Sequence, residues 1–125
     1  MKCKVKAISP VNPTEDLQKV IKAFSNVFEC ENLEHGEGYV ALSGELSCLL
    51  PLKEQLEKGQ IRDAARKMFL KGESSGNISF KLNKQAALVG KVNLVDGDLS
   101  PLGEIEVTLT AEDPQEVIEW LCSKE

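Results

Sequence analysis

The sequence predicts an α+β domain built on a single-layer, mostly antiparallel sheet with helices packed on one face. Two periodicities predict this class. In several short segments apolar and polar residues alternate, as in strands that bury one face. In other segments apolar residues recur every three or four positions, as in helices that bury one stripe. The predicted order of elements is β-α-β-β-α-α-β-β-β-α, in one domain that spans residues 1–125.

The first part of the chain predicts a strand, a helix and a weak hairpin. Residues of Lys2–Ile8 alternate, so that its three lysines share one exposed face and its apolar residues the other. A helix follows to about Phe28, with Asn12 as its N-cap and Thr14 as the competing cap. Two weaker strands flank the turn at Gly36–Gly38.

Two helices are predicted next. The first is short and buried, begins near Leu46 and is expected to end at Gly59 in a left-handed cap. The second covers Gln60–Lys71, buries one apolar stripe and stops at Gly72. Residues 73–76 are expected to form a flexible loop after it.

The rest of the predicted fold is arranged around residues 77–103. Residues 77–82 alternate as a strand with Phe80 facing inward. Residues 83–87 lack the Asn-Gly or Asp-Gly signal of a two-residue hairpin, so a longer connection is expected before a second strand over 88–95. Two turns then follow, at Asp96–Asp98 and at Ser100–Gly103.

A strand and a helix close the chain. Glu104–Thr110 alternates, with Glu104, Glu106 and Thr108 predicted to face outward. The helix after it is predicted to begin at Asp113, which is followed by proline and then by Glu116 in a capping-box pattern.

Length and composition bound the class of protein. A chain of 125 residues can bury a core without disulfides or a metal. No apolar run approaches the ~20 residues of a membrane span, and the N-terminal residues lack the apolar segment of a signal peptide. We therefore expect a cytoplasmic protein with no membrane partner.

No residue pattern points to catalysis or to a cofactor. The four cysteines lie too far apart in sequence to form a zinc ligand pair, and His35 is the lone histidine, in a polar loop. No serine, cysteine or lysine lies in a nucleophile signature. We therefore expect a protein that is not an enzyme, with no catalytic residues, no metal site and no cofactor.

Basic residues provide the candidate site. The net charge is −5, yet residues 74–95 contain no acidic residue, and the polar face of the helix predicted over residues 60–71 is basic. The candidates for contacts with a nucleic acid come from these two segments: Arg62, Arg66, Lys81, Lys84, Gln85 and Lys91. The basic side chains would contact phosphates, and Gln85 a base edge or a 2′-hydroxyl. The alternative is that they are solvated side chains of separate elements. If Lys84 and Lys91 are exposed, reversing either charge should change stability by only ~0.5 kcal/mol.

Five motifs make the sequence similar to a known family. In chain order they are Pro13-Thr14-Glu15-Asp16, Ile61-Arg62-Asp63-Ala64-Ala65-Arg66, Leu82-Asn83-Lys84-Gln85-Ala86-Ala87, Val89-Gly90-Lys91-Val92 and Ser100-Pro101-Leu102-Gly103. Together they resemble a family of small uncharacterised archaeal proteins over nearly the whole chain. The resemblance implies a fold similar to that of the large-subunit ribosomal protein that holds 5S rRNA. It also implies a grouping with predicted RNA-binding proteins linked to the archaeal exosome.

Two functions are compatible with these observations. The first is a non-catalytic RNA-binding or RNA-processing accessory protein that recognises the phosphate backbone and shape of a structured RNA, because exposed aromatic residues for base stacking are scarce. The second is a protein-interaction or assembly subunit. Its acidic segments, residues 23–57 and 96–125, would meet a basic partner, or its sheet edges would pair in a homodimer.

Overall fold

The computed structural model describes residues 2–29, 32–95 and 103–123. Their strands are β1 (Cys3–Pro10), β2 (Asn32–Gly36), β3 (Tyr39–Glu45), β4 (Glu73–Ser74), β5 (Asn77–Leu82), β6 (Leu94–Val95) and β7 (Ile105–Ala111). Their helices are α1 (Leu17–Val27), α2 (Leu50–Lys58), α3 (Arg62–Lys71), α4 (Lys84–Leu88) and α5 (Pro114–Leu121), with a 3-10 turn, η1 (Leu46–Leu49), before α2.

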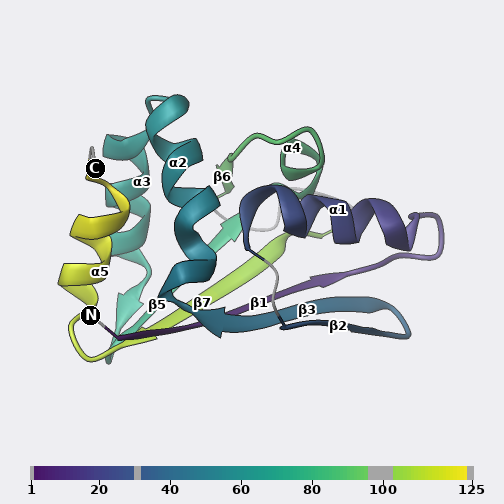
Figure 1. Cartoon of the computed structure of the whole chain (residues 1–125), viewed down its shortest axis with the longest axis horizontal. Helices are drawn as coiled ribbons and strands as arrows, with labels where there is room; N and C mark the ends of the chain where they lie inside the picture. The colour runs from purple at the N-terminus through teal and green to yellow at the C-terminus, as the bar shows by residue number, and fades with distance from the viewer. Residues whose placement is uncertain (1, 30–31, 96–102, 124–125) are drawn as a thin grey trace.

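These strands form one seven-stranded sheet whose neighbours pair antiparallel throughout. The order is β2-β3-β1-β7-β5-β4, and β6 pairs with β5. Figure 1 shows the five helices on one side of this sheet, while its other side carries no helix of the described residues. The predicted fold class, a mostly antiparallel sheet covered by helices on one face, is confirmed.

The hydrophobic core lies between the sheet and the helices. In β1, β5 and β7 every second residue is buried, as the alternation of the sequence predicts. The helices contribute residues such as Phe24, Leu52, Phe69 and Ile118, all of which are fully buried. None of the described helices has the length and apolar character that crossing a membrane requires.

The first helix begins later than predicted. Its N-cap is Asp16, whose carboxylate accepts a hydrogen bond from the Gln18 amide at 2.9 Å, so Asn12 and Thr14 are not the cap. The carboxylate of Glu15 instead accepts the Asn12 amide N–H at 3.0 Å, and the Glu15 amide donates to the Asn12 carbonyl at 2.9 Å. These two bonds make Asn12–Glu15 a closed turn ahead of the helix.

The predicted strand over residues 88–95 is wrong. Residues 84–88 form α4, and Asn83 caps it by accepting the Ala86 amide N–H at 2.9 Å. The Asn26 side chain of α1 donates to the carbonyls of Ala87 and Leu88 at 2.9 and 3.0 Å, which satisfies the end of this short helix. The strand is reduced to β6, because Gly90 adopts a left-handed conformation with φ of 79°.

Smaller differences occur at three other positions. Gly59 is not the left-handed residue at the end of α2, since its φ is −78° and Gln60 has a φ of 56° instead. Residues 73–74 form the short strand β4 rather than a loop. Glu104 precedes β7 and is buried instead of facing outward. The predicted turn at Asp96–Asp98, and all but the last residue of the turn at 100–103, lie outside the described residues.

Candidate nucleic-acid interface

The side of the sheet opposite the helices displays polar side chains from four adjacent strands. We call it the open face. It consists of Lys4, Lys6 and Ile8 of β1, Tyr39, Ala41, Ser43 and Glu45 of β3, Asn77, Ser79 and Lys81 of β5, and Glu106, Thr108 and Thr110 of β7; Glu45 pairs with Lys4. These residues alternate along their strands with the buried ones, so the two-residue period of a strand places them away from the core.

The strand register brings hydroxyl groups beside the lysines of β1. Lys6 pairs with Ser43 of β3 on one side and with Thr108 of β7 on the other, and Thr108 in turn pairs with Ser79 of β5. Neighbouring strands are about 4.8 Å apart, so these four side chains form one row across the face.

Three lysines lie at alternate positions in and directly before β1, a central strand of the sheet. Lys2, Lys4 and Lys6 are exposed and lie on the same side of the chain, with successive residues of the row about 6.7 Å apart. We call them the lysine row. Neither Lys4 nor Lys6 forms an ion pair within the described residues. The lysine row therefore provides positive charge at the middle of the open face.

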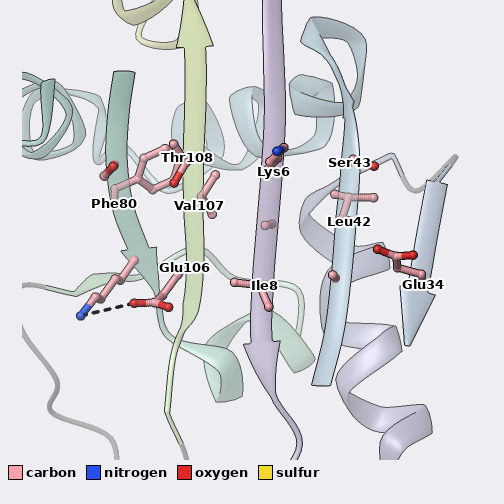
Figure 2. A pocket seen from close by; sticks show the side chains of 13 residues that line it. Lys6, Ile8, Glu34, Leu42, Ser43, Phe80, Glu106, Val107 and Thr108 are labelled. Atoms are coloured by element: carbon pink, nitrogen blue, oxygen red, sulfur yellow. Dashed lines mark ion pairs between the residues drawn. The ribbon is translucent and has the colours of Figure 1, made fainter. Parts of the chain in front are cut away.

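A shallow hollow of about 690 Å³ lies on this face, and Figure 2 shows its lining. The hydroxyls of Ser43 and Thr108 and the ammonium group of Lys6 line it as hydrogen-bond donors. Ile8, 47% exposed, lies between Glu106 and Ala41 in a second row across the strands, which ends at Glu34. The hollow thus offers hydrogen-bond donors, the carboxylates of Glu34 and Glu106 as acceptors, and an apolar patch.

An ion pair borders the hollow on the side of β5. The ammonium group of Lys81 lies 3.9 Å from the Glu106 carboxylate of β7, and both residues line the hollow. Lys81 is the one residue of the predicted set that the structure places on the open face. Its charge is partly balanced by Glu106, so its attraction for a phosphate is weaker than that of Lys6, whose partners in the strand register are Ser43 and Thr108.

The structure distributes the predicted site residues over three places. Arg62 and Arg66 lie on α3 in the helix layer, where Arg66 forms an ion pair with Glu119 of α5. Gln85 and Lys91 are exposed in and after α4, which Figure 1 shows apart from α3. The six residues therefore do not form one continuous surface.

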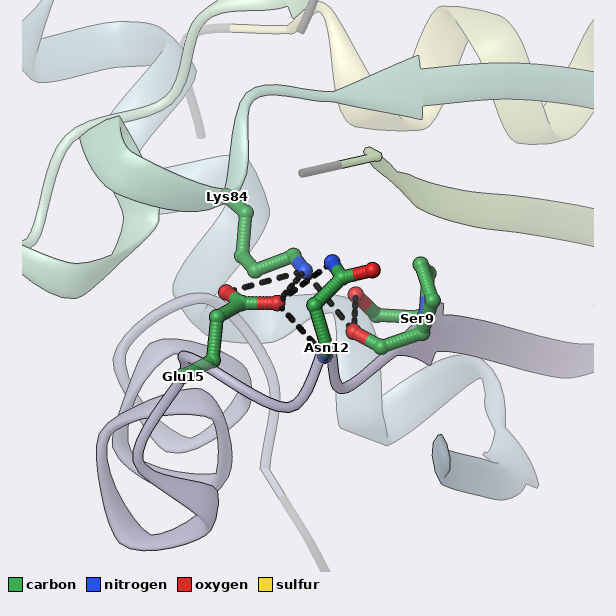
Figure 3. A network of polar contacts seen from close by, with 5 residues as sticks. Ser9, Asn12, Glu15 and Lys84 are labelled. Atoms are coloured by element: carbon green, nitrogen blue, oxygen red, sulfur yellow. Dashed lines mark hydrogen bonds and ion pairs between the residues drawn. The ribbon is translucent and has the colours of Figure 1, made fainter. Parts of the chain in front are cut away.

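Lys84 differs most from expectation, because it is 5% exposed. Figure 3 shows its ammonium group inside a polar network. It donates to the Pro10 carbonyl at 2.7 Å and to the two carboxylate oxygens of Glu15 at 2.9 and 3.1 Å. Lys84 therefore links the end of β1, the turn before α1 and the start of α4. The expectation that it contacts phosphate is corrected, because its charge is directed into the protein.

The same network lowers the pKa of Glu15. Burial of the Glu15 carboxyl favours its neutral form, but hydrogen bonds from Asn12 and Lys84, together with the positive charge of Lys84, outweigh burial and hold its pKa below the ordinary value. Glu15 is thus held ionised by Asn12 of its own turn and by Lys84 of α4. The network stabilises the contact between segments of the helix layer, on the side of the sheet opposite the open face.

Sequence reasoning found the lysine row but missed its neighbours. The alternation of each strand shows which residues face outward, yet the pairing that aligns Ser43, Thr108 and Ser79 joins segments far apart in the chain. Tyr39 was also missed, because it begins a weakly predicted strand. The only signal was its position directly after the Gly36–Gly38 turn.

Comparisons with known proteins show the family of the chain. A family model described as RNA binding matches residues 4–112, which is most of the chain, and the chain therefore belongs to this family.

Relatives of the chain include archaeal proteins named UPF0201. One from Sulfurisphaera tokodaii is 46% identical over 120 residues, covering 91% of this chain and 83% of that protein. One from Saccharolobus solfataricus is 37% identical over 127 residues, covering 97% and 88%. These matches confirm the resemblance to a family of archaeal proteins.

Solved structures share the fold. The crystal structure of a UPF0201 protein from Methanococcus jannaschii is 36% identical, has a TM-score of 0.79 and covers 98% of this chain and 100% of that one. A protein from Archaeglobus fulgidus is 23% identical with a TM-score of 0.70, covering 94% of this chain and 93% of that one, which shows the fold alone.

Proposed function

We propose that this protein is a non-catalytic RNA-binding module that holds RNA on its open face. The lysine row would contact phosphates, and the hydroxyls of Ser43, Ser79 and Thr108 would contact riboses or bases. The observation that carries the proposal is the row of exposed lysines on the central strand, within a chain of net charge −5. The RNA-binding description of the family supports the same class of ligand.

The proposal also includes a cellular role and a location. The resemblance to proteins linked to the archaeal exosome, and to the ribosomal protein that holds 5S rRNA, favours an accessory role in RNA processing in the cytoplasm. Contact through phosphates and shape fits such a role, because it tolerates many sequences. The residues first predicted in and near the helix layer, Arg62, Arg66, Gln85 and Lys91, stay candidate contacts for the same assay.

The test compares two matched pairs of charge reversals. Fluorescence anisotropy would measure RNA affinity across a salt series for the wild type, for Lys4→Glu/Lys6→Glu, and for Lys19→Glu/Lys22→Glu. Lys19 and Lys22 are exposed on α1, so the second variant makes the same change of charge in the helix layer.

We expect the β1 variant to bind much more weakly, with a salt slope smaller by about 0.7–0.9 for each phosphate that is no longer neutralised. The α1 variant should stay close to the wild type. Equal reductions of affinity in both would mean that general charge, and not the open face, governs binding. The proposal fails if the wild type binds no RNA at ~50 mM salt. Arg62→Glu/Arg66→Glu would be measured in the same assay. A reduction of RNA affinity in that variant alone would place the interface on α3 in the helix layer.

A second candidate function is protein assembly, and the outer strand β2 favours it. β2 pairs only with β3 in the described sheet, so its other edge presents backbone groups that can pair with another strand. Its residues are mostly exposed, and Glu34 adds negative charge there. Pull-down from a native extract, with and without nuclease, separates the two functions, because protein partners that survive nuclease treatment would favour assembly.

A further inference from the structure

Tyr39 is a partly exposed aromatic side chain at the end of the open face. It is 37% exposed and begins β3, where it pairs with Pro10 of β1. Ile8 and Ala41 form the next pair on the same face, so they lie between Tyr39 and Lys6 along the strands. The open face therefore carries Lys4 and Lys6 along one half of β1, and Ile8, Ala41 and Tyr39 along the other, where Glu106 and Glu34 flank the pair of Ile8 and Ala41.

The position of the Tyr39 ring is fixed by a glycine across the hairpin. Gly36 pairs with Tyr39, and two ring atoms of Tyr39 lie 2.5 and 2.9 Å, and its hydroxyl oxygen 3.0 Å, from the place that a Cβ atom on Gly36 would occupy. The ring thus fills the space above Gly36 that any other residue would need for its side chain. A ring held in this way loses little conformational freedom when a ligand packs on it.

The hairpin that carries the ring is itself tied to the end of β1. Glu37 and Gly38 form its turn, in which Gly38 has a φ of 81°. The Val11 amide donates to the Gly38 carbonyl at 2.8 Å. This bond fixes the tip of the hairpin, and with it Tyr39, relative to the strand that bears the lysine row.

The spacing and charge of these groups fit one stretch of single-stranded RNA. From Lys6 to Pro10, beside Tyr39, the strand extends about 13 Å, a distance that a few nucleotides can span. Glu34 lies on the same side of β2 as Gly36, so its carboxylate disfavours a phosphate near the ring. Phosphates would therefore follow the lysine row, and a base would reach the ring.

We infer that Tyr39 is a stacking site for an unpaired base of single-stranded RNA whose phosphates contact the lysine row. The inference rests on the proposed function and narrows its ligand. A base inside a duplex already stacks on both sides, whereas an unpaired base offers a free face to an aromatic ring. Ile8, which is exposed, and Ala41, which is half-buried, provide apolar contact for the ribose or base between the two halves.

The test uses three substitutions at one position and two RNA ligands. Tyr39→Ala removes the ring, Tyr39→Leu keeps apolar cover over Gly36 without an aromatic face, and Tyr39→Phe keeps the ring. Each variant would be titrated by fluorescence anisotropy with a short single-stranded RNA and with a blunt-ended duplex of the same sequence. Urea midpoints, measured on the same samples, show that the variants are folded.

We expect Tyr39→Ala and Tyr39→Leu to bind single-stranded RNA about tenfold more weakly, which is the value of one base stacked on an aromatic residue. Tyr39→Phe should match the wild type. The salt slope should not change, because the lysine row still neutralises the same phosphates. Affinity for the duplex should be weaker than for the single strand and the same in all variants.

The inference and the proposed function fail in different ways. If folded Tyr39→Leu binds single-stranded RNA as well as the wild type while Lys4→Glu/Lys6→Glu does not, the stacking site is refuted and the RNA-binding face stands. If the wild type prefers the duplex, the single-stranded ligand is refuted. If no RNA binds, both are refuted.

Discussion

Lys84→Met is the substitution that most directly tests the buried network. Methionine is close to lysine in length and fills the same space, so the change removes the charge and its hydrogen bonds with little loss of volume. The Lys84 side chain is 6% exposed and that of Glu15 12% exposed. Removing one partner of a buried ion pair costs about 3–5 kcal/mol, since the other charge is left without compensation.

The structure places the expected loss at the lower end of that range. After the substitution, the Glu15 carboxylate still accepts hydrogen bonds from the amide and the side chain of Asn12, at 3.0 and 2.9 Å. The Pro10 carbonyl keeps the hydroxyl of Ser9 at 3.1 Å. We therefore expect the free energy of unfolding to fall by about 3 kcal/mol, a large share of the stability of a small domain.

Urea unfolding at neutral pH is the assay, with Lys91→Met as the matched control. Lys91 is exposed, so its substitution should change the free energy of unfolding by less than about 0.5 kcal/mol. The double variant Glu15→Gln/Lys84→Met should lose less than the sum of the single variants, because each single change already breaks the shared pair. An effect of Lys84→Met as small as that of Lys91→Met, or strict additivity in the cycle, would refute the buried pair.

Three further predictions concern stability. Phe80→Ala should cost about 3–5 kcal/mol in urea unfolding, because Phe80 is 5% exposed and its ring centroid lies 4.8 Å from that of Phe69; a cost below about 1 kcal/mol would contradict this core position. Gly72→Ala should lower the melting temperature, since its Cβ would collide with the Ser79 backbone carbonyl; an unchanged melting temperature would contradict this close approach. The pKa of Glu15 is lower in the folded chain than its ordinary value of 4.5, so its stabilisation is complete above that pH and is lost as the pH falls through the folded pKa. Wild-type stability should therefore fall more steeply on acidification than that of Glu15→Gln, and parallel curves would contradict the shift.

The sequence predicts the strands best where one face of the sheet is buried and the other is solvated. In β5 and β7 the alternation of the residues is the alternation of burial, because a slip of one position would expose the whole buried set. The N-cap at Asp113 is also confirmed, with its carboxylate accepting the Glu116 amide at 3.2 Å. These features depend on interactions between residues close in sequence.

The features that depend on distant residues could not be predicted. α4 has only five residues, too few for a stable helix in isolation, and Asn26 of α1 supplies the donors at its end. Lysine is seldom buried, so its residue type predicts exposure for Lys84, whereas its partner Glu15 lies 69 positions earlier. The position of the Tyr39 ring could likewise not be predicted, because it depends on Gly36 lying directly across the hairpin.

The expected effect of substituting a lysine depends on the side of the sheet on which it lies. Lys4 and Lys6 alternate with core residues of β1, so reversing their charges leaves every buried side chain in place. Such a variant should lose RNA affinity while its free energy of unfolding changes by about 0.5 kcal/mol or less per site. Lys84, chosen from the sequence on the same chemical grounds, should instead affect stability. Measuring both quantities for each basic residue therefore assigns it either to the interface or to the scaffold.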